Sequence, residues 1–136
     1  MREMKFRARR SFTGTIGSDS IWNHSSFIHA KYTEDGQLWS VNIGGMKCQP
    51  ETLGQYTGKK DANGKEIYEG DILHSRLHSY RHSVVWDSSV AAYRVIPITQ
   101  DELLTELERG FLGGFLWTTN AVVVGNVYDN QDLLTV

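Results

Sequence analysis

Short stretches in which apolar and polar side chains alternate run along most of the chain. Residues 4–8 alternate apolar with basic side chains, and this period of two predicts a half-buried strand. Residues 26–33 and 38–43 are two further β-prone runs. The Asp35-Gly36 pair between them predicts a hairpin turn, because glycine accepts the positive φ that such a turn requires.

The second half of the chain adds several β-prone runs and one helical segment. Thr99 followed by Glu102 is a capping box, and the leucines after it fall on one face, so residues 99–109 are predicted to form a short helix. A short helical end is expected at Leu133-Leu134. Further strands are predicted at residues 72–77, 83–87, 90–98, 115–117 and 122–124.

Many short strands separated by turns, with one helix, are typical of a small barrel or sandwich. The predicted fold class is therefore mainly β, with short antiparallel strands in a small β-barrel or in segregated sheets. A chain of 136 residues is long enough to bury a core without a covalent cross-link, and its length fits a single domain over residues 1–136.

The net charge and the cysteine content argue against some classes of protein, among them proteins that coat nucleic acid and proteins with disulfides. The formal net charge is −2, whereas proteins that coat nucleic acid are usually basic overall. Cys48 is the only cysteine, so neither an intramolecular disulfide nor a cluster of several cysteines around a metal can form. The first residues are charged and have no apolar segment typical of a signal peptide. We therefore expect a protein of the reducing cytoplasm.

Residues 110–128 contain no charged side chain and have the length of a membrane span. Thr118, Thr119 and Asn120 lie in the middle of this stretch, and glycines interrupt it. A hydrocarbon core would penalise these polar groups. Two buried strands joined by a turn are the preferred interpretation, and no contact with a membrane is expected.

Three stretches together carry a family likeness. They are residues 1–8, residues 55–58 and 61–72 with their Asn63-Gly64 turn, and residues 124–130 followed by Leu133-Leu134. In this order and at these positions the chain resembles the YopX family of phage and prophage proteins. The resemblance implies a small, mostly β fold with a tendency to self-associate, and it implies no reaction. The family motif is expected to be structural, and its residues are Gln55, Tyr56, Thr57, Gly58, Asn63, Gly64, Tyr68, Gly70, Asp71, Gly125 and Asn126.

The N-terminal segment is rich in basic residues that could contact phosphates, and a run of lysines lies near residue 60. Acidic residues adjoin those lysines and would weaken a positive field. The alternative interpretation is a solvated strand with charges that discourage aggregation. The candidate nucleic-acid-binding residues are Arg2, Lys5, Arg7, Arg9 and Arg10.

His74, His78 and His82 follow one another at intervals of four residues. On a helix this spacing would place three imidazoles on one face, where they could bind zinc. The flanking sequence favours strands instead, and strands would not align the three rings. These histidines are therefore weak metal candidates, and neither a metal nor another cofactor is expected.

Asp71 and Cys48 are the two residues whose chemistry would suit catalysis. Asp71 could act as a carboxylate or cap a turn, and Cys48 could be a nucleophile or a small half-buried residue. No partner base stands at an interpretable spacing, so no catalytic residue is assigned and an enzyme is not expected. The four tryptophans are expected mostly in the core. The candidate contact region is Phe111, Leu112, Phe115 and Leu116.

The sequence thus predicts an accessory protein of a phage or prophage that has no enzymatic activity. It is expected to form homo-oligomers or to bind a host or phage protein. The alternative is a nucleic-acid-binding module that uses the basic N-terminal strand.

Overall fold

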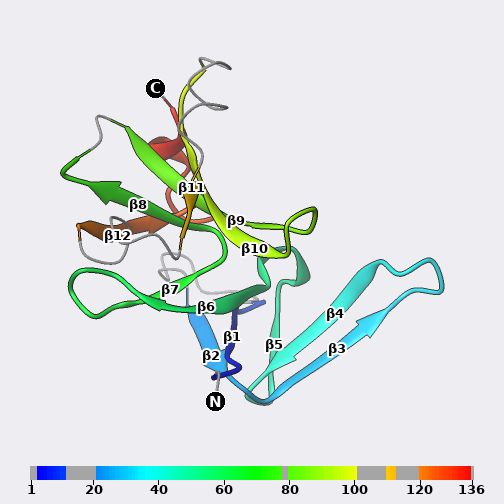
Figure 1. Ribbon diagram of the computed structural model, residues 1–136. Coiled ribbons are helices and arrows are strands. Elements are labelled where there is room, and N and C mark those ends of the chain that lie inside the picture. The colour runs from blue at the N-terminus through cyan, green and yellow to red at the C-terminus, as the bar shows by residue number, and fades with distance from the viewer. Residues whose placement is uncertain (1–2, 12–20, 78–79, 101–109, 113–119, 136) are drawn as a thin grey trace. The chain divides into compact units, whose positions relative to one another are not determined.

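The computed structural model describes residues 3–11, 21–77, 80–100, 110–112 and 120–135 (Figure 1). The chain forms two compact units, an N-terminal unit, Met1–Tyr56, and a C-terminal unit, Thr57–Val136. The paired strands of both units are antiparallel, which confirms the predicted mainly β fold. The single domain expected over residues 1–136 stays a prediction.

The N-terminal unit contains two sets of paired strands. β1 pairs with β2 on one side and with Gly54 and Gln55 of β6 on the other. A separate three-stranded sheet has the order β3-β4-β5. The elements are β1 (Phe6–Arg9), β2 (Trp22–Ser25), β3 (Ile28–Tyr32), β4 (Leu38–Ile43), β5 (Met46–Cys48), the 3-10 helix η1 (Pro50–Thr52) and the start of β6 (Gly54–Lys60).

Apolar side chains at alternate positions of the strands point to one side and form the core of this unit. Ala8, Val41, Ile43 and Cys48 are fully or almost fully buried together. Full burial of a valine or isoleucine side chain, as at Val41 and Ile43, stabilises the fold by about 1.5–3 kcal/mol. A margin of partly buried residues packs around them, namely Phe6, Ile28, Ala30, Leu38 and Leu53.

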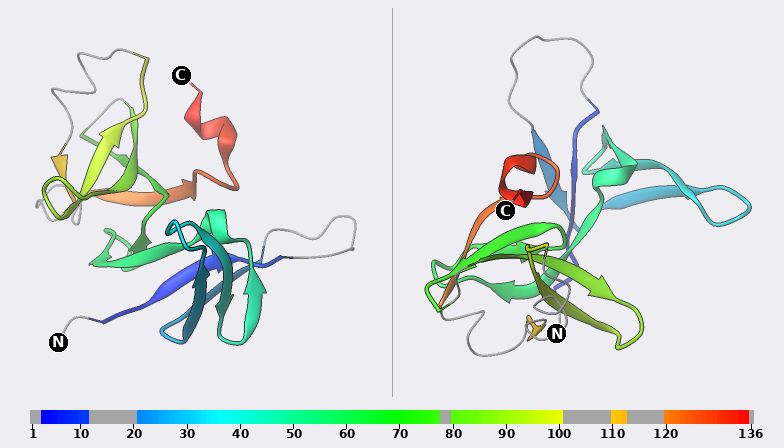
Figure 2. Two further views of the ribbon diagram at one scale, coloured as in Figure 1. Left: turned by 90° about the vertical axis from the view of Figure 1, so that its right-hand side faces the viewer. Right: turned by 90° about the horizontal axis from the view of Figure 1, so that it is seen from above.

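The predicted hairpin over residues 26–43 is confirmed as β3 and β4, with Gly36 at a φ of 87° in the turn. The register shifts between Lys31 and Tyr32, because Lys31 faces Ser40 whereas Tyr32 faces Leu38. Trp39 is the extra residue of this bulge. The hairpin forms a two-stranded ribbon whose tip extends away from the other strands of its unit (Figures 1 and 2).

The C-terminal unit is built on a five-stranded sheet of order β11-β10-β9-β8-β12. The strand that comes last in the chain therefore lies beside β8, and the rest of β6 pairs with β7. The elements are β7 (Glu66–Tyr68), β8 (Asp71–Ser75), β9 (Arg81–Asp87), β10 (Ala92–Pro97), β11 (Gly110–Phe111), β12 (Ala121–Asn126) and the 3-10 helix η2 (Gln131–Leu134).

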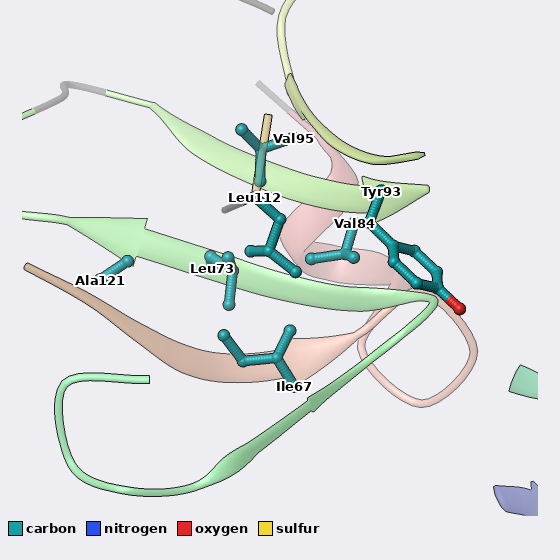
Figure 3. Close-up of a cluster of buried hydrophobic side chains, with 7 residues drawn as sticks. All are labelled: Ile67, Leu73, Val84, Tyr93, Val95, Leu112 and Ala121. Atoms are coloured by element: carbon teal, nitrogen blue, oxygen red, sulfur yellow. The ribbon is translucent and has the colours of Figure 1, made fainter. Parts of the chain in front are cut away.

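One face of this sheet carries the core of the unit (Figure 3). Val84 of β9 and Val95 of β10 are direct cross-strand partners, and Leu73 of β8 lies in the same cluster. The buried members are Ile67, Leu73, Val84, Tyr93, Val95, Leu112 and Ala121. The cluster joins residues from five strands and one turn, so the unit depends on contacts between segments distant in sequence.

Several predicted elements of this unit are confirmed. β9 and β10 match the strands expected at 83–87 and 90–98, and Pro97 ends β10. The helical end at Leu133-Leu134 is η2. Residues 101–109 of the predicted helix and the predicted strand 115–117 lie outside the described residues. Among the residues that the structure describes, no helix has the length and apolar character needed to cross a bilayer.

Candidate functional site

The central part of the family motif forms a turn that is held by a buried carboxylate. Asp61 Oδ1 accepts hydrogen bonds from the backbone N–H groups of Asn63 at 2.8 Å and Lys65 at 2.9 Å. Its Oδ2 accepts a third from the N–H of Val123 in β12, at 2.9 Å. Gly64 has a φ of 82°, as the predicted Asn-Gly turn requires. Asp61 therefore ties this turn to a strand that lies 62 residues further along the chain.

Sequence reasoning did not single out Asp61. An Asp two residues before an Asn-Gly pair is a known turn signal, because its short side chain reaches the backbone two residues on. The bonds from Asp61 to the nearby turn could therefore be predicted from the sequence. Its bond to Val123 could not be predicted, because that bond depends on the fold.

Asp71 occupies the bend between β7 and β8. Its Oδ2 accepts a hydrogen bond from the N–H of Tyr68 at 2.8 Å, and Gly70 between them has a φ of 88°. Gly70 donates to Val84 O and accepts from the N–H of Val127, both at 2.9 Å. The carboxylate of Asp71 thus caps a turn, which is the structural alternative to a catalytic role.

The C-terminal part of the motif forms a second turn. Asn126 Oδ1 accepts hydrogen bonds from the N–H groups of Tyr128 at 3.0 Å and Asp129 at 2.9 Å. Asn130 Oδ1 accepts from the N–H of Asn126 at 3.1 Å. A Cβ at Gly125 would lie 2.5 Å from Asn130 Oδ1, so a side chain at this position conflicts with the turn.

The first motif residues belong to β6. The N–H of Tyr56 donates to Lys5 O at 2.7 Å, which extends the pairing of β6 with the N-terminal segment. The hydroxyl of Thr57 donates to Ile67 O at 2.7 Å, and Gly58 has a φ of 84°. These residues and the two turns above shape the local backbone.

The basic N-terminal strand is engaged inside its own unit. The guanidinium of Arg7, a buried residue, lies 4.8 Å from the centre of the Trp22 ring. The ammonium of Lys5 pairs with Glu3 at 3.1 Å and lies 5.7 Å from the centre of the Tyr56 ring. Both cations thus rest on aromatic rings, an arrangement that stabilises them by cation–π attraction.

Two further arginines bind amide side chains. Arg9 donates from Nε and Nη2 to Gln49 Oε1 at 3.1 and 2.9 Å, and Arg10 donates to Asn23 Oδ1 at 2.6 Å. Arg2 lies outside the described residues. The four described cations therefore all have contacts within their own unit.

The histidine series does not form a helical face. His74 lies in β8 and His82 in β9, and their cross-strand partners are Arg81 and Leu73. Because directly opposed residues share a face of a sheet, the two imidazoles lie on opposite faces. His74 is exposed, His82 is fully buried, and His78 lies outside the described residues. Across the described ranges, no three His, Cys, Asp or Glu side chains form a group suited to a metal ion.

Two other candidates are buried. Cys48 is 1% exposed, and burial raises the pKa of its thiol, so the nucleophilic thiolate is disfavoured near neutral pH. Leu112 lies in the core of the C-terminal unit, so its assignment to a contact region was wrong. Phe115 and Leu116 lie outside the described residues, and Phe111 belongs to β11.

The β3–β4 hairpin carries the most exposed aromatic side chains of the described chain. Phe27 is 71% exposed, Tyr32 60% and Trp39 56%. The ammonium of Lys31 lies 5.6 Å from the centre of the Trp39 ring. We call Phe27, Tyr32 and Trp39 the aromatic set. Sequence reasoning placed most tryptophans in the core and missed this set, because the bulge at Trp39 cannot be read from the alternation.

Comparisons with known proteins place the chain among its relatives. No curated protein matches it. The crystal structure of protein EF1440 from Enterococcus faecalis is similar, with 21% sequence identity and a TM-score of 0.49, over 99% of this chain and 100% of that one. The model of the family described as YopX protein matches residues 3–135, so the chain belongs to the YopX family.

Proposed function

We propose that this protein is a non-enzymatic interaction protein that self-associates, encoded by a phage or prophage and acting in the cytoplasm of the bacterial host. The observation that carries the proposal is the exposure of the aromatic set on the β3–β4 hairpin. Family membership supports it through the self-association that the resemblance implies. A host or phage protein is the alternative partner for this hairpin.

The energetics favour a partner for this hairpin. A large aromatic side chain buries about 150–250 Å² when it is covered. Transfer of apolar surface from water contributes about 25 cal/mol for each Å². Tyrosine and tryptophan are accordingly enriched among the residues that dominate binding energy. Covering Trp39 and Tyr32 would therefore supply several kcal/mol before the costs of association are counted.

The test uses sedimentation velocity to measure self-association of two variants, each of which lacks one of two tryptophans of similar exposure. Trp39 lies on the hairpin, whereas Trp86 is 46% exposed on β9, where its ring centre is 5.0 Å from that of Tyr93. We expect Trp39→Ala to weaken self-association about tenfold or more, which corresponds to about 1.4 kcal/mol. Trp86→Ala is the matched control and should associate like the wild type. Equal effects of both variants would contradict the hairpin as the contact surface, and thermal melts verify that each variant folds.

Nucleic-acid binding is the second candidate function, and one arrangement favours it. Arg7 and Arg9 share a face of β1, Lys5 directly precedes this strand, and the rings of Trp22 and Tyr56 lie beside Arg7 and Lys5 respectively. Basic and aromatic side chains on one sheet face are typical of surfaces that bind single-stranded nucleic acid. The burial of Arg7 and Tyr56 counts against it.

Fluorescence anisotropy of labelled oligonucleotides across a salt series tests this second function. Binding through Lys5 and Arg9 should weaken steeply with salt, and the double variant Lys5→Gln, Arg9→Gln should reduce the salt slope by about two. The matched control is Lys59→Gln, Lys60→Gln, which removes the same charge from β6. An absence of binding at low salt would exclude this function.

A further inference from the structure

β3 is the outermost strand of the described β3-β4-β5 sheet, so one of its edges faces away from β4. The N–H of Gly44 donates to Phe27 O at 2.9 Å, which marks Phe27 and Gly44 as a hydrogen-bonded pair. In an antiparallel ladder such pairs alternate with non-bonded ones. His29 and Lys31 therefore direct their backbone groups toward β4, opposite Asn42 and Ser40.

The remaining residues of β3 direct their N–H and C=O groups outward. They are Ile28, Ala30 and Tyr32. Within the part of the chain that the structure describes, no hydrogen bond reaches these outward groups. The extra residue of the bulge lies in β4, so β3 itself remains regular.

Natural proteins protect such edges with proline, with charged side chains or with a covering segment. β3 has no proline. Its one lysine, Lys31, lies over the ring of Trp39, which belongs to β4. Among the described residues, this edge therefore has no proline and no segment hydrogen-bonded along it, and an uncovered edge is a template for a further strand.

We propose that the edge of β3 pairs antiparallel with β3 of a second copy of this chain. The inference rests on the proposed self-association and names its contact. One register joins every outward residue to another outward residue. In this register Ala30 faces Ala30 of the partner subunit, and Ile28 faces Tyr32 of the partner subunit. Each of these pairs exchanges two backbone hydrogen bonds.

The side chains fit this register. Ile28 and Ala30 belong to the partly buried margin of the N-terminal core, and Tyr32 is exposed on the same side of β3. Pairing would therefore cover Ile28 with Tyr32 of the partner subunit, an aliphatic–aromatic pair that stabilises antiparallel sheets. On the other side, His29 would face Lys31 of the partner subunit, so the two lysines would not face each other. This self-complementarity favours a second copy over an unrelated strand.

Cysteine cross-linking tests the register directly. Opposed residues of a hydrogen-bonded pair have Cα atoms about 5.5 Å apart, within the range of a disulfide. We expect Ala30→Cys to form a covalent dimer under mild oxidation. Lys31→Cys is the matched control, because in this register the two Lys31 Cα atoms would be further apart than the roughly 7 Å that a disulfide allows. The wild type, whose Cys48 is buried, gives the background.

A proline variant supplies a second measurement. Ala30→Pro removes one outward N–H and leaves the hydrogen bonds between β3 and β4 in place. It should weaken association at least tenfold, whereas Ala30→Val, which keeps the N–H, should associate normally. Should Ala30→Pro fail to fold in circular dichroism, the cross-linking result decides.

The outcomes separate this inference from the proposed function. Dimers cross-linked through position 30 and not through position 31 support the edge pairing. A wild type that associates while both cysteine variants cross-link equally would overturn the edge pairing and leave the proposed function standing. Association with an unrelated strand and no cross-linking between copies would overturn it as well. A monomeric wild type would overturn both.

Discussion

Single polar side chains hold the turns of this protein together. Asp61 accepts three part-buried backbone hydrogen bonds and is itself only 6% exposed, so its removal would leave three N–H donors without this acceptor. A buried donor without a partner costs about 1–3 kcal/mol. One carboxylate thus stabilises both the Asn63-Gly64 turn and the position of β12.

We predict that Asp61→Ala lowers the free energy of unfolding by roughly 3 kcal/mol, because several donors lose their acceptor at once. Chemical denaturation followed by fluorescence measures the change. Asp132→Ala is the control, since Asp132 is exposed and should change stability by less than about 0.5 kcal/mol. Similar stabilities for the two variants would show that Asp61 does not hold the turn.

Gly125 is constrained by a different effect, the lack of space. We predict that Gly125→Ala destabilises the protein by about 1–3 kcal/mol, because its Cβ would displace the Asn130 amide that accepts from Asn126. Gly45→Ala is unsuitable as a control, since Gly45 has a φ of 84° and alanine would be strained there. The double variant Gly125→Ala, Asn130→Ala removes the clash, so it should cost less than the sum of the single changes. Additive effects would refute the steric explanation.

At the scale of the element, hydrogen bonds stabilise the turn at the tip of the β3–β4 hairpin. The N–H of Thr33 donates to Gln37 O at 2.8 Å, and the N–H of Gln37 donates to the Thr33 hydroxyl oxygen at 3.0 Å. The same hydroxyl donates to the carboxylate of Asp35. This bond is the main reason that the pKa of Asp35 lies below its ordinary value, and a hydrogen bond from the Asp35 backbone N–H adds to it.

The pKa shift predicts how the tip responds to acid. A lowered carboxyl pKa in the folded state means that the charged form stabilises the turn above the ordinary pKa. This contribution is lost as the pH falls through the lowered value. We expect an NMR titration of the Asp35 carboxyl carbon to have its midpoint below the ordinary value of 3.8, and Thr33→Val to move it back toward that value. An unchanged midpoint in Thr33→Val would contradict the assigned cause.

The elements also show which parts of the fold a sequence can reveal. The β3–β4 hairpin was predictable, because its turn type is encoded locally by Asp35-Gly36. β2 and β5 were not predicted, because Trp22–Ser25 and Met46–Cys48 are short and have no clear alternation. The exposure of Trp39 was hidden for another reason. Plain alternation would place it beside Val41, and the bulge instead turns Leu38 toward the core.

At the scale of the whole molecule, the mainly β class followed from the sequence. The candidate contact region did not, because Leu112 packs against residues such as Val84 and Val95 that are distant in sequence. The aromatic set could not be recognised either, since exposure is decided by tertiary packing. Turns could thus be predicted from their local residues, whereas the exposed surfaces could be identified only once the fold was known.

Self-association through the β3–β4 hairpin is the central claim, and the mass of the wild type in solution tests it most directly. Sedimentation equilibrium from low micromolar to millimolar concentration would measure this mass. The predicted result is a mass that rises from 15.4 kDa toward a multiple of that value as concentration increases. A mass that remains at 15.4 kDa over the whole range would contradict the claim.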